Sequence, residues 1–298
     1  GIYLVGREFF SRKKRSWAPL LAAFFTATSF WHLNFSRIGF RAISVPFFAT
    51  FGLYFLLRGL RKNNILDLTL AGVFIGLGFH TYIAFRFMPF VIAIPLGVAL
   101  WRWWQHRRTL ATASVPIPAS WHTVACAPCA VILFLFITFI TALPIGWYFL
   151  QHPESFVGRG AQVSIFETPS PAWEFIKSNA LTAQMFFWRG DCNWRHNFAC
   201  KPQLNSIVAI FFLIGIAYTL RSLFKKYIRP HHLSRAHAML LVTCFGFMTL
   251  PATLTAEGLP HALRAIGVIP PVMLIAGLGA ASLLSSIQSW LQQRSIRY

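Results

Sequence analysis

Long apolar runs alternate with short polar segments along most of the chain. A run of ~20 apolar residues crosses the ~30 Å hydrocarbon core of a bilayer as a helix, because no backbone polar group can stay unpaired in lipid. The pattern therefore predicts an all-α, polytopic membrane protein with about eight transmembrane helices. The expected spans lie near residues 17–35, 41–57, 65–80, 82–101, 123–149, 204–220, 237–255 and 261–284.

One long polar stretch, residues 151–203, interrupts this pattern. It contains four of the seven acidic residues and two of the five cysteines. Apolar runs precede and follow it, so it should stand on one face of the membrane. We expect a long extracytoplasmic loop there, between a transmembrane module at 1–150 and C-terminal transmembrane helices at 204–298.

Proline positions predict how two helices begin. The segment from Pro171 to Gly190 should form a short helix lying on the membrane surface. Pro260 suits the first position of the final span, whose free amides would face outward. Arg264, about one turn further, could then hold a phosphate in a bidentate contact, although a plain helix start with an interfacial Arg explains it too. Pro270 and Pro271 should kink this span.

The composition supports a membrane location. Hydrophobic residues make up 56% of the chain and charged residues only 11%, whereas water-soluble domains carry roughly 25% charged residues. The net charge of +20 would suggest a nucleic-acid partner in a soluble protein. Here the charge sits in short clusters between apolar runs, as the positive-inside rule produces, so we expect no nucleic acid.

Basic residues also predict the orientation of the spans. If every span crosses, one side holds 18 of the 27 Lys and Arg residues with two acids, and the other holds nine basic residues with five acids. The positive-inside rule makes the first side cytoplasmic and places the loop at 151–203 outside. The start, GIYLVGREFFSRKKRS, does not have the order of a signal peptide, and we interpret the chain as a fragment of a longer protein.

This topology brings polar residues from several spans to the outer face. Each Arg alone is explained by contact with lipid headgroups, but polar residues on separate spans favour a shared anionic site. The candidate binding residues are Arg37, Arg41, His80, Tyr82, Arg86, Arg195, His196, Asn197, His261 and Arg264, with Asp191 and Glu257 as weak candidates for a site carboxylate.

The cysteines fall into two pairs and a single residue. Cys192 and Cys200 lie on the predicted oxidising side and are expected to form a disulfide, the alternative being two free thiols. Cys126 and Cys129 spell CAPC inside an apolar run without a thioredoxin-like pattern, so we expect them only to pack. No metal-binding spacing occurs, so no cofactor is predicted, although a divalent metal is not excluded.

Several motifs resemble the GT-C class of integral-membrane glycosyltransferases. LVGREFFSRKKRSWAPLLAAFFTATSFWHLNFSRIGFRA and LAGVFIGLGFHTYIAFRFMPFV are most similar to the family 39 type, which includes protein O-mannosyltransferases and the aminoarabinose transferases of lipid A. GDCNWRHNFACKPQLN and EGLPHALRAIGVIPP look like motifs of uncharacterised bacterial members. The resemblance spans nearly the whole chain.

The resemblance implies an enzyme that moves a hexosyl or pentosyl group from a polyprenyl-phosphate carrier to a protein, lipid or glycan acceptor on the outer membrane face. It implies a single inverting displacement, arginines that hold the lipid phosphate, and a location in a bacterial cytoplasmic membrane. The family's catalytic acid is expected in a first outer loop, which would lie upstream of Gly1. The sequence also has Arg41 and Ala42 where many relatives place an Asp, so the catalytic residue is unknown and this fragment is expected to be inactive alone.

Two functions from other classes remain as alternatives. A lipid-carrier flippase or secondary transporter would need charged residues near the membrane midplane or paired broken helices. The sequence places its charges at the ends of the spans, which argues against a transporter. A membrane scaffold without catalytic activity is the other alternative.

Overall fold

The computed structural model describes residues 1–10, 16–112, 126–224 and 233–295. In these ranges the chain is helical and contains no strand beyond one isolated bridge between Ser164 and Thr255. The predicted basic clusters at 11–15 and 225–232 lie outside the described residues. The predicted all-α class is confirmed for the described part of the chain.

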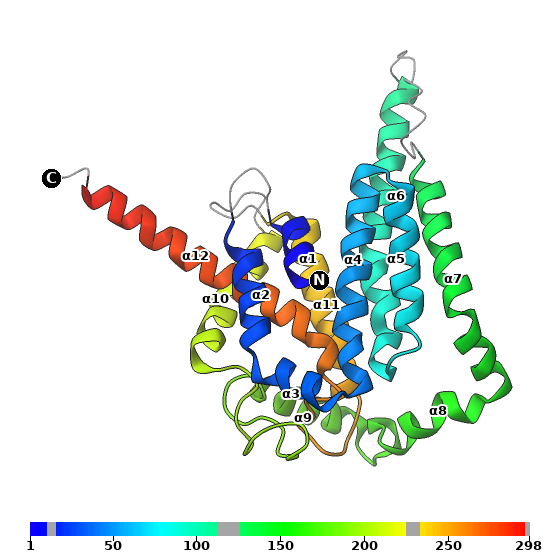
Figure 1. Cartoon of the computed structure of the whole chain (residues 1–298), viewed down its shortest axis with the longest axis vertical. Helices are drawn as coiled ribbons and strands as arrows, with labels where there is room; N and C mark the ends of the chain where they lie inside the picture. The colour runs from blue at the N-terminus through cyan, green and yellow to red at the C-terminus, as the bar shows by residue number, and fades with distance from the viewer. Residues whose placement is uncertain (11–15, 113–125, 225–232, 296–298) are drawn as a thin grey trace.

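Twelve α-helices and four short 3-10 helices make up this part of the chain (Figure 1). The α-helices are α1 (Ile2–Phe9), α2 (Ala18–Thr28), α3 (Phe30–Ile38), α4 (Ser44–Lys62), α5 (Ile65–Gly78), α6 (Met88–Thr112), α7 (Ala127–Gln151), α8 (Pro153–Gln162), α9 (Pro171–Gln184), α10 (Ser206–Phe224), α11 (Arg235–Thr253) and α12 (Ile269–Ser295). The 3-10 helices are η1 (Arg41–Ile43), η2 (Ile83–Phe87), η3 (Ile165–Glu167) and η4 (Ile266–Val268).

Six helical segments of the described chain are long and apolar enough to cross a membrane. They are Arg41–Lys62, Ile83–Arg108, Ala127–Gln151, Ser206–Phe224, Arg235–Thr253 and Ile266–Gln293. Two more predicted spans, at 17–35 and 65–80, correspond to the shorter apolar helices α2 and α5. The protein is therefore a polytopic membrane protein.

The long helices run between two ends of the molecule, and different elements build each end. One end carries α3, α8, α9 and the loop at 185–205, and we call it the outer end (Figure 1). The opposite end carries the α4–α5 turn, the last turns of α6 and the starts of α7 and α11, and we call it the basic end. This arrangement matches the alternation of spans that the charge distribution predicts.

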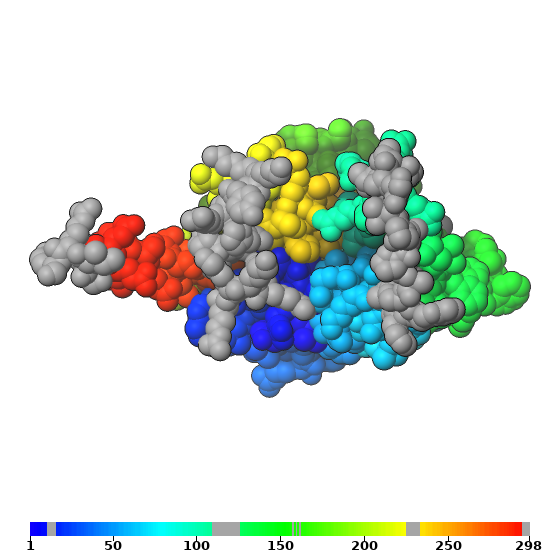
Figure 2. Space-filling model, turned by 90° about the horizontal axis from the view of Figure 1, so that it is seen from above, coloured from blue at the N-terminus to red at the C-terminus, as the bar shows by residue number. Residues whose placement is uncertain are grey.

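The first half of α12 forms the centre of the packing against α2 and α10. Its residues from 269 to 282 are buried, and glycines let the neighbouring backbones approach closely. A Cβ on Gly279 would collide with the Phe211 carbonyl of α10, and one on Gly277 would collide with the Ala18 carbonyl of α2. The C-terminal half of α12 projects beyond the other helices (Figure 2).

Helix α7 shows how lipid accounts for the exposed apolar surface. Ile132, Phe136 and Phe139 are 66%, 57% and 64% exposed on this helix. An apolar face of this length would favour aggregation in water, whereas the hydrocarbon core of a bilayer covers it. The opposite side of α7 packs against α5, where the backbones meet at Gly72 and Gly76.

The predicted continuous span at 17–35 is wrong, because the helix breaks at Ser29. Ser29 has an extended backbone, so α2 ends at Thr28 and α3 begins at Phe30. Helix α3 lies at the outer end, where Trp31 and Phe35 are fully buried and Asn34 contacts the loop. Asn34 of the stretch FWHLNFSR thus bonds to the loop at 185–205.

The predicted start of the last span also needs correction. Pro260 is not the first residue of a helix: it follows a cis peptide bond, and α12 begins only at Ile269. Pro270 and Pro271 therefore lie in the first turn of α12 and do not kink its middle, because first-turn residues have no intrahelical N–H bond to lose. The surface helix at 171–190 begins at Pro171 as predicted, but ends at Gln184.

Candidate functional site at the outer end

Asp191 is the hub of the outer end. Its side chain is buried, and its Oδ2 accepts hydrogen bonds from His196 Nδ1 at 2.9 Å and from the backbone N–H of Ala262 at 2.8 Å. Its Oδ1 accepts from the backbone N–H of Asn193 at 2.8 Å. One carboxylate thus joins the loop after α9 to the segment before α12, and His261 Nδ1 lies 3.9 Å from the same Oδ2.

The loop around Asp191 is closed by a disulfide and by buried amide bonds. Cys192 and Cys200 are joined, as predicted. Asn197 Nδ2 donates to the Asp191 carbonyl at 3.0 Å and to the Lys201 carbonyl at 2.6 Å. A Cβ on Gly190 would collide with the Lys201 carbonyl, so this position requires glycine. Asn197 therefore holds the loop together and does not present its amide to a ligand.

The segment from Thr253 to Arg264 is fixed from several sides. The Trp31 indole N–H donates to the Ala262 carbonyl at 3.2 Å, and Ser178 Oγ donates to the Thr253 carbonyl at 3.0 Å. Backbone bonds of 3.2 and 2.9 Å join residues 163–165 to residues 254–256. Helices α3 and α9 and the start of the long loop thus position the segment that carries His261 and Arg264.

Arg264 is half-buried and turned back onto its own segment. Its Nη1 donates to Thr255 Oγ1 at 2.9 Å and to the Glu257 carbonyl at 2.7 Å. Tyr82, Glu257 and Asp191 all lie close enough to interact with it electrostatically. Both hydrogen bonds use a single nitrogen of a guanidinium that has five N–H donors. The side chain is thereby oriented with donors to spare for an anion.

Burial and neighbouring charges set the protonation states at this site. Burial and then the charge of Arg264 lower the pKa of His261 to about 4, so this imidazole is neutral at pH 7. Burial works to raise the pKa of Asp191, but its bonds from His196, Asn193 and Ala262 outweigh burial and lower it. The carboxylate is therefore ionised, and the site pairs an anionic hub with the cation Arg264.

Asp191, His196 and His261 are also the group that could hold a metal ion in the described part of the chain. One ligand atom from each lies within 4.8 Å of the others. Asp191 Oδ2 already accepts two hydrogen bonds, however, and His196 points its Nδ1 at that oxygen. A metal would bind His196 through Nε2, or through Nδ1 at the expense of the Asp191–His196 bond.

The structure brings together about half of the predicted site residues. His196, His261 and Arg264 gather around Asp191, and Tyr82 and the exposed Glu257 lie close to Arg264. The rings of His196 and His261 have centroids 4.8 Å apart. The residue that precedes η2, the long loop and the segment before α12 therefore lie near one another.

The other predicted residues lie elsewhere, so the expected convergence is wrong for them. His80 Nε2 lies 3.0 Å from the Thr141 carbonyl of α7. Arg86 donates to the Phe156 carbonyl at 2.7 Å and anchors α8. Arg195 is exposed with its guanidinium over the Phe40 ring, and Arg37 and Arg41 are exposed. Asp191 is not an accessible carboxylate, because three donors occupy its oxygens.

Sequence reasoning missed Trp31, Asn34 and Thr255. Asn34 Nδ2 donates to the carbonyls of Arg195 and His196 at 3.3 and 3.1 Å, and Thr255 orients Arg264. Asn34 and Trp31 stand in the stretch predicted to cross the membrane. The sequence feature that could have identified a surface helix there is the polar Asn34 between the aromatic residues Trp31 and Phe35.

The second cysteine pair also differs from expectation. Cys126 and Cys129 are joined by a disulfide at the start of α7, whereas the sequence predicted that they only pack. Cys126 is the N-cap residue of α7, and its Sγ accepts the Cys129 N–H at 3.3 Å. A three-residue separation across the first helical turn brings the two sulfurs together. Cys244 remains a buried thiol.

Comparison with known proteins gives one remote likeness. No protein-family model matches the chain, and no curated protein matches it. The structure is similar to that of the Archaeoglobus fulgidus oligosaccharyltransferase tethered to an acceptor peptide with the NVT sequon, at 16% identity and a TM-score of 0.48. The alignment covers 97% of this chain and 37% of that protein, so this chain spans well under half of its length. A likeness this remote does not assign a function.

Proposed function

We propose that this protein transfers a sugar from a polyprenyl-phosphate carrier to an acceptor at the outer end of the bundle. The observation that carries the proposal is the position of His261 and Arg264 beside the buried carboxylate of Asp191, with Tyr82 close enough to act on Arg264 electrostatically. These residues come from two of the segments, GFHTYIAFR and EGLPHALR, that resemble the GT-C glycosyltransferases. The acceptor would be a protein, lipid or glycan, and the membrane a bacterial cytoplasmic membrane.

Arg264 supports this proposal through the chemistry of the leaving group. In a single displacement, the bond from the sugar C1 to the phosphate oxygen breaks while the acceptor oxygen bonds to C1. The departing polyprenyl phosphate gains negative charge, which a fixed guanidinium stabilises in a water-poor site. Thr255 and the Glu257 carbonyl hold Arg264 in place before the substrate arrives, so little ordering is required on binding.

The remaining groups have supporting roles in this proposal. His261 is neutral, so it does not repel the sugar C1 as positive charge develops there, and it can share a hydrogen bond with a sugar hydroxyl. Asp191 and His196 are positioning residues that fix the His261 segment. The acceptor proton requires an accessible carboxylate. Glu257 is exposed beside Arg264 and is the described acid that fits this role, alongside the acid that the resemblance places upstream.

A carrier flippase or secondary transporter finds less support. That function needs ionisable residues in the middle of the spans. In the α4–α5 hairpin, Arg58 Nε lies 3.1 Å from Asp67 Oδ2, and this ion pair stands near the basic end of both helices. Arg61 of α4 lies beyond this ion pair, toward the same end. These charged residues therefore lie near the ends of the helices and not in the middle of the spans.

A labelling experiment tests where the carrier binds. A polyprenyl-phosphate sugar with a photoreactive group beside the phosphate is added to right-side-out vesicles that contain the protein, and the labelled peptides are mapped. We expect label on residues 255–268, and its loss when unlabelled carrier competes. Arg86 contacts both α7 and α8, away from Arg264. Label found only on peptides of these two helices would contradict the proposal.

A further inference from the structure

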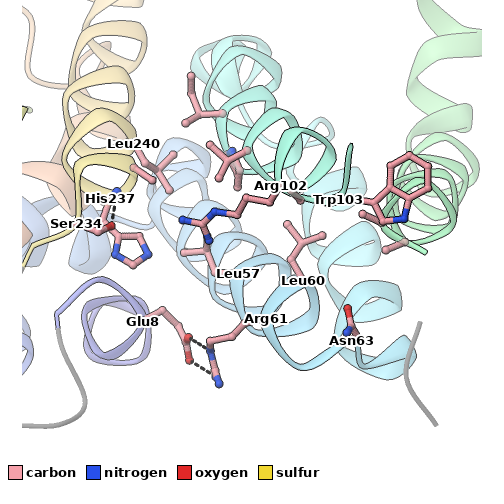
Figure 3. Close-up of a pocket in the computed structure, with 17 residues that line it drawn as sticks. Glu8, Leu57, Leu60, Arg61, Asn63, Arg102, Trp103, Ser234, His237 and Leu240 are labelled. Carbon is pink, nitrogen blue, oxygen red and sulfur yellow. Dashed lines mark hydrogen bonds and ion pairs between the residues drawn. The ribbon is translucent and has the colours of Figure 1, made fainter. Parts of the chain in front are cut away.

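A second site-like feature lies at the basic end, away from Arg264. A cavity of 610 Å³ opens between α1, α4, α6, α7 and α11 (Figure 3). This volume falls in the range of about 300–1,000 Å³ that is typical of pockets for small molecules. Most of its lining side chains are apolar, and a few polar groups gather on one side, which is the usual composition of a ligand site.

The polarity of the lining changes in the same direction along the helices that form it. On α6, Ile94, Val98 and Arg102 follow one another at four-residue spacing and so share one face, with Arg102 nearest the basic end. On α11, Leu240 lies deeper than His237, because the helix begins at the basic end. The cavity is thus apolar in its depth and polar toward the membrane surface.

Cationic groups outnumber acids in the polar part. Glu8 is the only acid among the described residues that line the cavity, and Arg61 donates to both of its oxygens at 3.0 and 3.2 Å. Arg102 extends from α6 toward His237 and Leu57, and it acts on His237 electrostatically (Figure 3). Two guanidinium groups and one carboxylate thus line the cavity, so the charge of its described lining is complementary to an anion.

We propose that this cavity binds the phosphate head of an anionic lipid, with Arg102 holding the phosphate and the hydrocarbon chain lying against Ile94, Val98 and Leu57. A ligand with one phosphate and one apolar chain matches the change from polar to apolar lining. The aromatic residues next to Arg102 favour this depth, since Trp103 lines the cavity and Trp side chains concentrate at membrane interfaces. This lipid site does not depend on the proposed transfer reaction at the other end.

Lipid titration tests the proposal directly. The full chain is stripped of lipid, placed in nanodiscs of phosphatidylcholine and titrated with dioleoyl phosphatidic acid, and bound lipid is counted by native mass spectrometry. We expect saturable binding of phosphatidic acid, weakened about 10- to 100-fold by Arg102→Gln, as loss of a charge-assisted hydrogen bond predicts. Arg221→Gln is the matched control, because Arg221 is an exposed cation near the same end but does not line the cavity.

A second variant separates shape from charge. Val98→Trp fills the cavity without changing charge and should also abolish binding in protein that remains monodisperse. Equal binding of phosphatidylcholine, or equal loss with Arg221→Gln, would overturn the proposal in favour of general surface attraction. Soluble glycerol phosphate that binds as tightly as the lipid would overturn it too, because the apolar wall would then contribute nothing.

Discussion

At the outer end, Asp191 is 3% exposed and three donors hold its two oxygens. At the basic end, the Glu8 side chain is equally buried at 3%, but its partner Arg61 has a side chain that is 43% exposed. The first arrangement is a network that joins two segments distant in sequence, the loop after α9 and the segment before α12. The second includes the Arg61–Glu8 ion pair beside an open cavity. The comparison shows where this protein uses buried polar bonds to fix a geometry and where it leaves charge accessible.

The difference follows from what each end must hold in place. Loops and short helices build the outer end, and their backbone groups have no helix partners, so side chains such as Asp191 and Asn197 satisfy them. In the described part of the basic end, regular helices satisfy most of their own backbone groups, and side chains such as Asn64 and Ser234 cap their first turns. Arg61 and Arg102 of these helices line the cavity, and the positive-inside rule predicts such basic residues at one membrane face.

Labelling from outside gives the largest contrast between the two ends. In cells that express single-cysteine variants, a membrane-impermeant maleimide should modify Glu154→Cys near the start of α8 and leave Lys62→Cys at the end of α4 unmodified. The charge asymmetry motivates this all-or-none result. Permeabilised cells are the control, in which both sites should react. The opposite pattern in intact cells would place the proposed transfer site in the cytoplasm.

The redox states of the two cysteine pairs also distinguish the two ends. Both pairs are joined in the structure, but a cytoplasmic basic end would keep Cys126 and Cys129 reduced in the cell, while Cys192 and Cys200 stay oxidised outside. Alkylation of intact cells with a permeant reagent, followed by peptide mapping, measures both pairs at once. Two oxidised pairs would argue against a reducing compartment at the basic end.

Removal of the hub carboxylate should destabilise the outer end strongly. Asp191→Ala leaves the buried donors of His196 and Ala262 without an acceptor, and we expect a loss of about 3–5 kcal/mol in the free energy of unfolding. Chemical denaturation in detergent measures it. Glu174→Ala is the control, since its pair with Lys177 is a surface pair worth at most ~1 kcal/mol. Equal losses in both variants would show that Asp191 is not a hub.

Acid should weaken the outer end through His261. The pKa of His261 is lowered to about 4 when folded, against an ordinary value of about 6.5, so the unfolded chain binds the proton more readily between these values. Stability is therefore fully present above about pH 6.5 and declines as the pH falls toward 4. The measurement is the free energy of unfolding at several pH values, for the wild type and for His261→Gln, whose side chain still accepts a hydrogen bond. The decline in this free energy should be smaller by about 2–3 kcal/mol in the variant. The contribution of Asp191 runs the same way at lower pH, since its stabilisation is lost as the pH falls below about 4 through its lowered pKa.

Sequence patterns predicted the helices better than the site. Apolar runs located α4, α6, α7, α10 and α11 because span length and hydropathy depend on local composition. The break at Ser29 and the late start of α12 escaped, because they depend on contacts with distant segments, such as the bond from Trp31 to Ala262. Length and apolarity alone cannot show that such a stretch leaves the membrane.

Site residues marked by a local sequence feature were also predicted better than those set by contacts with distant segments. Arg264 and His261 were found because charged residues beside an apolar span are conspicuous, and the Cys192–Cys200 pair because its spacing allows closure. Asp191 was named only as a weak candidate for a site carboxylate and is a buried acceptor, since no local feature shows that Ala262 donates to it. Arg86 was expected at the site and instead anchors α8 through the Phe156 carbonyl, a contact 70 residues away in sequence.

The central claim is that Arg264 at the outer end binds the phosphate of the lipid carrier. The direct measurement is the transfer rate against carrier concentration for the protein expressed from its natural gene and for Arg264→Ala and Arg264→Lys, with membrane insertion checked in parallel. A charge-assisted hydrogen bond contributes roughly 1.5–3 kcal/mol, so Arg264→Ala should lose about one to two decades in kcat/KM for the carrier. Arg264→Lys should recover only part, since an ammonium lacks the planar fork of the guanidinium. Wild-type kinetics in well-inserted Arg264→Ala would contradict the account and leave Arg264 as a residue that only contacts Thr255 and the Glu257 carbonyl.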